Sequence, residues 1–280
     1  MEDPYNAPPP SYGFGMLNVI FVVIGLIVIY YMYRFLYSGA ATQKASTTLI
    51  SKQQSAAIHP APFTNAPPPF EGGDYSVNTW IYISSYNKNM NRRKHIFEIK
   101  GEYFSTLLIA LGAFKNSLTV RTQSDSVLEG FQNSGNGSGT TTPNSGNTGS
   151  LSASNVDALF ADMSMDDAIL NTPPICDLPE IDLQRWTMLT VVISGRTIDV
   201  YLDGKLSRSC TSPSYYKVDP TGVKMNLLDR GGFDGYIGNT MVGAYSMNPD
   251  EIYRNYLSGP NGVSMDILSW ISSLFGGPKL

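Results

Sequence analysis

The stretch LQRWTMLTVVISGRTIDVYLDGKLSRSC constrains the fold of this chain more than any other. An apolar run over residues 186–193 and an alternating run over residues 197–202 are separated by a short turn. Both patterns are typical of β-strands. The dipeptide Asp203-Gly204 favours a two-residue hairpin turn, whose central residues need positive φ. We therefore expect a third strand, residues 205–210, to fold back on the second.

The register of this hairpin follows from its loop length. Counting outward from two loop residues places Tyr201 opposite Leu206 and Asp199 opposite Arg208. We expect the second pair to form a cross-strand ion pair that holds the register. The apolar members of these strands are predicted to form the core: Trp186, Val191, Ile193, Val200 and Leu202.

The composition suits one large all-β sandwich with attachments. Only 15% of the 280 residues are charged, whereas the chain holds 17 Tyr and 26 Gly. The net charge is −4, and the scattered Lys and Arg form no basic stripe, which argues against nucleic-acid binding. Short segments bounded by Gly, Asn or Ser predict further antiparallel strands near residues 75–83, 95–99, 106–111, 118–121, 224–228 and 235–247.

A long apolar segment precedes this domain. Residues 14–33 contain no charge, and as a helix they would span roughly 30 Å, the thickness of a bilayer core. We predict a transmembrane helix over residues 14–37, because the segment is apolar on every face and ends in tyrosines typical of a membrane interface. A buried core helix is the alternative. The predicted span includes Phe14, Val22, Ile24, Leu26, Ile29 and Tyr33.

Cations flank the predicted span on one side only. Arg34, Lys44 and Lys52 follow it and none precedes it, so the positive-inside rule places the C-terminal domain in the cytosol. In that reducing space a cysteine bridge would need a dedicated oxidase, and the sequon at Asn136 would stay unmodified.

Composition also sets the domain boundaries. Residues 1–13 and a Ser-, Gly- and Asn-rich insertion at 123–172 have little to bury, so we expect a disordered tail and a flexible insertion. A short helix within residues 156–170 is compatible with the second half of the insertion. A Pro-, Ser- and Ala-rich stalk over residues 38–69 leads to the sandwich, residues 70–260.

Two helices are predicted at the end of the chain. Asn248 as N-cap and Pro249 at the first helical position indicate the start of one. The second lies within residues 261–280, and its amphipathic part, residues 264–275, lacks the Lys and Arg that favour a lipid surface. We expect its apolar face to dock on protein, either its own sandwich or a partner. That face comprises Ile267, Trp270, Ile271, Leu274 and Phe275.

The segments WTMLTVVISGRTIDVYLDGKL and GGFDGYIGNTMVGAYSMNPDEI resemble the concanavalin A-like (laminin-G-like) jelly-roll superfamily. The resemblance covers residues 70–259 and implies an all-β, antiparallel jelly-roll sandwich. With Cys176 before Leu-Pro and Cys210 after the hairpin, the chain is most similar to members encoded by large nucleocytoplasmic DNA viruses. The sequence is compatible with two alternatives for Cys176 and Cys210, a disulfide between them or two free thiols.

Some members of the superfamily are glycosidases with an E-x-D-x-E strand, and Glu180, Asp182 and Gln184 follow that spacing. An amide at the third position cannot act as the general acid, so we predict no enzyme. His59 and His95 are isolated in the sequence and are expected to be packing or solvent-facing residues. No catalytic, cofactor or metal site is predicted.

The resemblance implies a membrane-anchored virion protein: a minor capsid protein that links an internal membrane to the capsid shell and contacts other virion proteins. The alternative is a lectin-like module that binds glycans during host attachment. Lectins of this fold hold calcium and sugar with loop carboxylates and amides, although such side chains also stabilise turns by themselves. We predict no cofactor, and calcium bound by these loops is the alternative. The loop residues concerned are Asp74, Asn87, Asn89, Asp229 and Asp234.

Overall fold

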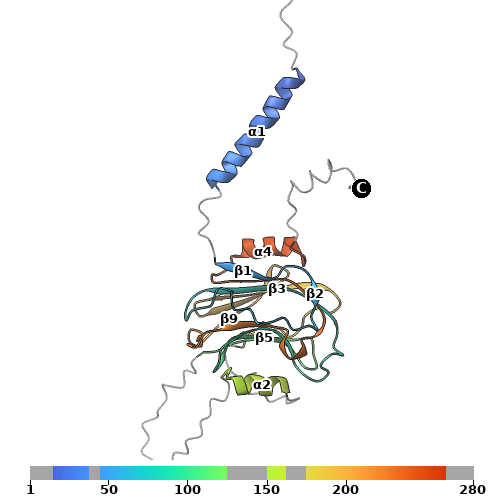
Figure 1. Ribbon diagram of the computed structural model, residues 1–280, viewed down its shortest axis with the longest axis vertical. Helices are drawn as coiled ribbons and strands as arrows, with labels where there is room; N and C mark the ends of the chain where they lie inside the picture. The colour runs from blue at the N-terminus through green and yellow to red at the C-terminus, as the bar shows by residue number, and fades with distance from the viewer. Residues whose placement is uncertain (1–14, 38–44, 125–149, 162–174, 263–280) are drawn as a thin grey trace, which may run out of the picture. The chain divides into compact units, whose positions relative to one another are not determined.

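Two antiparallel β-sheets packed face to face form the body of the chain (Figure 1). The structure is a computed structural model that describes residues 15–37, 45–124, 150–161 and 175–262. The chain divides into two units, Met1–Lys44 and Ala45–Leu280. The predicted antiparallel β-sandwich is confirmed in the second unit.

The larger sheet has seven strands in the order β1-β11-β3-β7-β8-β9, with β2 paired to β11. Its strands are β1 (Ser46–Ile50), β2 (Gln54–Ser55), β3 (Tyr75–Ser85), β7 (Trp186–Ser194), β8 (Thr197–Leu202), β9 (Lys205–Thr211) and β11 (Asp234–Gly243). The smaller sheet, of order β10-β4-β5-β6, consists of β4 (Lys94–Lys100), β5 (Ser105–Leu111), β6 (Leu118–Thr122) and β10 (Lys224–Leu227). Each strand predicted from the sequence coincides with one of these elements, although β11 is shorter than expected.

Apolar side chains at alternate strand positions fill the space between the sheets. Val191, Ile193 and Val200, which the sequence predicted as core, belong to this cluster, and Leu202 packs at its margin. Burying a Val, Leu or Ile side chain contributes about 1.5–3 kcal/mol to folding. The central cluster is therefore the main source of stability in the sandwich.

Each sheet is also covered on its outer face (Figure 1). Helix α4 (Pro249–Ser258) covers part of the larger sheet, where Ile252 packs with Trp80 and Met188. Helix α2 (Ala153–Ala161) covers the smaller sheet, where Phe160 packs with Leu108. All seven residues of β5 are consequently buried, which explains why this strand is apolar at successive positions rather than alternate ones.

The start of α4 follows the predicted capping pattern. The Asn248 side chain accepts a hydrogen bond from the Glu251 backbone N–H at 2.8 Å, and Pro249 occupies the first turn. This cap satisfies one of the backbone donors that a helix leaves free at its start. The helix start predicted from the sequence is confirmed.

The first unit contains helix α1 (Met16–Tyr37), which coincides with the segment predicted to span a membrane. Within the described part of the chain, no helix combines the length and apolar character needed to cross a membrane. The helix predicted within residues 261–280 lies almost wholly beyond the last described residue, Gly262.

The predicted stalk, residues 38–69, is wrong from residue 46 onward, because the sandwich begins at β1. Thr47 pairs with Val242 of β11, Ala56 is fully buried and Ala66 is nearly so. A sheet ladder uses main-chain groups, so small polar residues such as those of β1 can form an edge strand. The insertion at 123–172 is likewise not wholly flexible, since residues 151–161 pack on the smaller sheet.

The predicted hairpin register holds near the loop and is wrong further out. Tyr201 pairs with Leu206 as expected, but a β-bulge then shifts β9 by one residue, so that Asp199 pairs with Ser209. The predicted ion pair of Asp199 with Arg208 is therefore not formed. Arg208 donates instead to a backbone carbonyl, that of Asp177, at 2.8 Å.

The predicted core position of Trp186 is also wrong. Successive side chains of a strand point to opposite faces, and Trp186 is five residues before Val191 in β7. It therefore lies on the outer face, where it packs partly buried beside the α4 cluster.

The variant Ile252→Ala tests the outer layer. Because this side chain is fully buried beneath α4, we expect the free energy of unfolding to fall by about 2–4 kcal/mol in urea titrations followed by circular dichroism. Leu257→Ala, on the same helix but 65% exposed, is the matched control and should change it by less than about 0.5 kcal/mol. Equal effects would contradict docking of α4 through Ile252.

Candidate functional site

Three aromatic side chains form a row across the outer face of the larger sheet. Tyr236 of β11 pairs with Tyr82 of β3, and Tyr82 pairs with Trp186 of β7. The ring centroids of Tyr82 lie 6.1 Å from those of Tyr236 and 5.6 Å from those of Trp186. We call Tyr82, Trp186 and Tyr236 the aromatic row.

The aromatic row lies beside the surface that α4 covers. Two residues before Tyr82, Trp80 is buried and stacks on Tyr256 of α4, with centroids 5.6 Å apart and rings inclined by 13°. In contrast, Tyr236 is 46% exposed, and Tyr82 and Trp186 are partly exposed. The sheet thus presents aromatic surface to solvent where the helix no longer shields it.

A charged group directly precedes Trp186 in the sequence. Arg185 is 54% exposed, and its guanidinium group pairs with Asp182 at 2.8 Å and with Asp203. Asp203 is in turn fixed by a hydrogen bond from the Met188 backbone N–H at 2.9 Å. The result is a planar cation held between two carboxylates at the residue before Trp186, a group that offers both donors and acceptors to a ligand.

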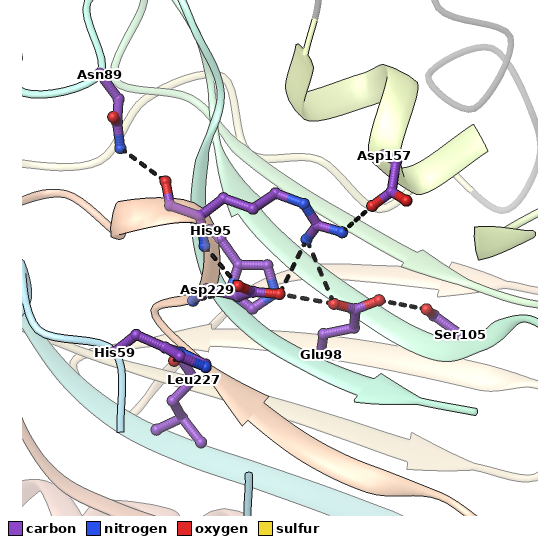
Figure 2. A network of polar contacts seen from close by, with 9 residues as sticks. His59, Asn89, His95, Glu98, Ser105, Asp157, Leu227 and Asp229 are labelled. Carbon is purple, nitrogen blue, oxygen red and sulfur yellow. Dashed lines mark hydrogen bonds and ion pairs between the residues drawn. The ribbon is translucent and has the colours of Figure 1, made fainter. Parts of the chain in front are cut away.

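A second cluster, of charged and polar groups around the buried Glu98 and His95, lies between the smaller sheet and α2 (Figure 2). The carboxylate of Glu98 accepts hydrogen bonds from the Ser105 hydroxyl and from His95 Nε2, the latter at 3.2 Å. Arg230 approaches the same carboxylate at 3.6 Å and pairs with Asp157 of α2 at 2.5 Å. The cluster therefore connects β4 and β5 to the helix that covers them.

The protonation state of this cluster follows from its hydrogen bonds. The Asp229 backbone N–H donates to His95 Nδ1 at 3.1 Å, so Nε2 carries the proton that bonds Glu98. Burial lowers the pKa of His95 and keeps the ring neutral. Burial by itself raises the pKa of Glu98, but His95, Ser105 and Arg230 together lower it to about 2. Glu98 is thus a buried anion.

The Glu98 cluster does not have the geometry of a nucleophilic triad. Ser105 donates to the carboxylate rather than to His95, and the side chains of all three residues are buried. His59, in contrast, is exposed and donates from Nδ1 to the Leu227 carbonyl at 2.7 Å. The two histidines thus serve packing and hydrogen bonding.

The residues that match the glycosidase spacing lie in the loop before β7. Glu180, Asp182 and Gln184 are exposed there. Within the described residues, no group of three or more His, Cys, Asp or Glu is placed to hold a metal ion. The loop residues considered for calcium make hydrogen bonds within the protein. Asp74 accepts from the Ser194 hydroxyl, Asp234 from the Ser85 hydroxyl and Asp229 from the Arg230 backbone N–H. The Asn89 side chain donates to two backbone carbonyls, and the Asn87 backbone N–H donates to the Ser85 hydroxyl at 3.2 Å.

Cys176 and Cys210 form a disulfide with Cα atoms 5.8 Å apart. The bridge joins β9 to the segment that leads into β7.

Val22, Ile24, Leu26 and Ile29 are exposed along α1. Phe14 and the side chain of Tyr33 lie outside the described residues, as do the docking residues Ile267, Trp270, Ile271, Leu274 and Phe275.

A hollow of about 330 Å³ lies elsewhere in the loops, lined by Glu71, Gly72 and residues 214–217. Tyr215, 55% exposed, packs beside Gly72 there, and Glu71 pairs with Lys217 at 3.7 Å. This hollow also combines an aromatic ring with charged groups. It has one exposed ring, compared with three neighbouring rings in the aromatic row.

Tyr82 and Tyr236 were not singled out from the sequence. Trp80 and Tyr82 alternate along β3 with Ile81 and Ile83, so the two pairs point to opposite faces of the sheet. The sequence of this strand could therefore have indicated an aromatic stripe on its second face. The row itself depends on β11 lying beside β3, strands that are far apart in the sequence. No local pattern specifies that neighbourhood.

No protein-family model and no curated protein matches this sequence. Among solved structures, the chain is similar to the binding domain of Botulinum neurotoxin serotype D, with TM-score 0.41, 11% identity and coverage of 66% of this chain and 36% of that chain. The chain is also similar to Trypanosoma rangeli sialidase, with TM-score 0.39, 10% identity and coverage of 67% of this chain and 23% of that chain. A third similar structure is domain 4 of the arabinanase AbnA from Geobacillus stearothermophilus, solved in complex with arabinotriose. Its TM-score is 0.37 and its identity 14%, with coverage of 66% of this chain and 69% of that chain. These TM-scores are too low to assign the chain to any of these proteins' folds.

The variant Glu98→Gln tests the buried anion. Since the folded-state pKa is about 2 against an ordinary 4.5, ionised Glu98 stabilises the fold fully above pH 4.5, and this contribution disappears as the pH falls toward 2. We expect the variant to lose about 3 kcal/mol of unfolding free energy at pH 7, with the difference from the native chain shrinking below pH 4.5. The exposed Glu102→Gln is the control. A difference independent of pH would show that Glu98 is not ionised.

Proposed function

We propose that this chain is a membrane-anchored, non-catalytic carbohydrate-binding protein, in which a concanavalin A-like jelly-roll presents the aromatic row to glycans. The observation that carries the proposal is the row itself: three neighbouring rings, of which Tyr236 is exposed and the other two are partly exposed, with Arg185 next to Trp186 in the sequence. Neighbouring large apolar side chains on a protein surface commonly mark a binding site.

The chemistry of the row fits a sugar ring. A pyranose has a face of C–H groups that packs on an aromatic ring, and hydroxyl groups around its edge that both donate and accept hydrogen bonds. Tyr82, Trp186 and Tyr236 supply the apolar surface with their own hydroxyl and indole N–H groups at its edge. Arg185 with Asp182 and Asp203 supplies the charged partners. Because Arg185 already provides a fixed cation, we propose no metal at this site.

The membrane anchor in this proposal is α1. The uncharged sequence that includes most of this helix runs from residue 14 to residue 33 and is long enough for a bilayer core. Exposed apolar side chains at nearly every position from Val19 to Met32, on all sides of α1, support contact with lipid rather than water.

The disulfide supports a position of the domain outside the cytosol. Disulfides persist in oxidising compartments and are rare in the cytosol, so the Cys176–Cys210 bridge opposes the orientation that Arg34, Lys44 and Lys52 favour. Three scattered cations are a modest bias. A virion tether, the function implied by the resemblance, would use the same anchor with the domain on the cytosolic face. Topology therefore separates the two proposals.

Binding of the full chain in detergent to a glycan array tests the site. We expect Trp186→Ala and Tyr236→Ala to weaken glycan binding at least ten-fold, because each removes a stacking surface worth about 1.4 kcal/mol. Tyr215→Ala removes a ring that is 55% exposed from the separate hollow, and this variant should bind normally. An array that stays blank with the native chain, or a loss confined to Tyr215→Ala, would sink the proposal.

Protease protection in sealed microsomes tests the topology. With a tag after Leu280, we expect the C-terminal tag to be protected and Asn136 to gain a glycan, because a glycan-binding domain outside the cytosol faces the lumen during synthesis. A digested tag with an unmodified Asn136 would instead support the tether.

A further inference from the structure

We propose that one end of the sandwich binds an anionic lipid surface through three neighbouring loops. These loops are residues 57–60 after β2, residues 86–94 between β3 and β4, and residues 112–117 between β5 and β6. We call them the basic loop cluster. Lipid binding by this cluster does not depend on glycan binding by the aromatic row.

The basic loop cluster concentrates positive charge in a chain whose net charge is −4. It contains five of the 19 Lys and Arg residues and neither Asp nor Glu. Arg92 and Lys115 are exposed, and Lys88 and Arg93 are partly exposed. These cations come from two loops that are separate in the sequence, so only the fold gathers them into one surface that attracts anions.

The acids on adjoining segments offset this charge only in part. Asp229 and Asp157 both pair with the Arg230 guanidinium group, at 3.5 Å and 2.5 Å. Glu180 is exposed one residue before a backbone hydrogen bond to residues 112–117. A carboxylate with a cation beside it contributes less to the field at a distance than an unpaired one. The cations therefore dominate at the loops themselves.

Each loop of the cluster also exposes one large apolar side chain. Ile58 is 64% exposed, Met90 is 62% exposed and Phe114 is 51% exposed. Asn89 and Asn91, on either side of Met90, have φ angles of 51° and 61°, a left-handed conformation that Asn adopts more readily than most residues. The neighbours of Met90 therefore specify the turn that carries it at the surface.

Side chains of the cluster hold its loops together. Lys88 Nζ donates to the Ala57 carbonyl at 3.0 Å, and the Tyr86 hydroxyl donates to the Lys115 carbonyl at 3.0 Å. The buried Lys94 places its Nζ 4.2 Å from the centre of the Tyr86 ring. The exposed apolar side chains and the cations thus belong to one connected surface.

A lipid bilayer matches both components of this surface. Lys and Arg side chains are attracted to the negative potential of an anionic leaflet, and apolar side chains enter the boundary between headgroups and acyl chains. A polyanion such as an acidic polysaccharide would use the cations but leave Ile58, Met90 and Phe114 in water. An anionic lipid surface therefore fits the cluster better than an anionic polymer.

A polarity-sensitive dye at residue 90 of the full chain tests the proposal. Met90→Cys provides one reactive thiol, because Cys176 and Cys210 are bridged. The chain labelled there with NBD is reconstituted in vesicles of phosphatidylcholine alone or with phosphatidylserine, and excess empty vesicles of the same composition offer a second surface. We expect NBD emission to rise at least about two-fold only with phosphatidylserine. The same dye at Leu206→Cys, 54% exposed on β9, should not respond.

Charge variants of the Met90→Cys chain test the role of the cations. Arg92→Ala with Lys115→Ala should weaken the response at least about ten-fold in vesicle titrations, because each cation near an anionic leaflet contributes to binding. Lys205→Ala with Lys224→Ala removes the same charge from exposed residues of β9 and β10 and is the matched control. It should keep the response.

Four outcomes would overturn the proposal. One is a dye response of equal size without phosphatidylserine, and another is no response with either lipid. The third is an equal loss in the Lys205→Ala, Lys224→Ala control. The fourth is a response to heparin without vesicles that phosphatidylserine does not reproduce, which would assign the cluster to an anionic polymer. A blank glycan array with the dye response intact would refute the proposed function and leave lipid binding in place.

Discussion

Burial of the facing sides of both sheets, with helices over part of their outer sides, is the constraint on which this structure depends. The central cluster between the sheets holds them together, and α4 and α2 cover the outer faces with clusters of their own. A sandwich exposed on its outer faces would alternate polar and apolar side chains along each strand. Here β4, β5 and β6 are buried at nearly every position. The larger sheet is covered less completely, since β9 is exposed at nearly every position and Tyr236 of the aromatic row is 46% exposed.

The buried charges beneath α2 show how the smaller sheet tolerates polar residues. Glu98 is fully buried, and an isolated carboxylate there would be costly. His95, Ser105 and Arg230 surround it, and Arg230 also bonds Asp157 of α2 and lies 4.8 Å over the Phe160 ring. A buried ion pair adds little net stability, but removing one member leaves the other unpaired. The cluster therefore fixes which surface α2 covers more than it strengthens the fold.

Local sequence patterns predicted the strands, the Asp203-Gly204 turn and the Asn248 cap, because each depends on residues a few positions apart. Features that depend on strand order were not predicted. β1 was missed because its pairing with β11 uses backbone groups and leaves no apolar pattern. The bulge at Ser207 changed the partner of Arg208. Trp186 lies five residues before Val191 in the same strand, so its side chain points to the opposite face, and the sequence prediction did not take this alternation into account. The row joins three strands that only the topology brings together.

The disulfide and the flanking cations favour opposite membrane orientations of this chain, and the disulfide is the stronger argument. Orientation by positive charge acts once, during insertion, and three cations spread from residue 34 to residue 52 act weakly. A disulfide must survive in the compartment where the folded domain resides. The Cys176–Cys210 bridge fixes the segment before β7 to β9, and β7 carries Trp186 with Arg185 just before it. Reduction of the bridge would thus loosen the strand connection that positions one end of the row, which links the redox environment to the surface proposed to bind glycans.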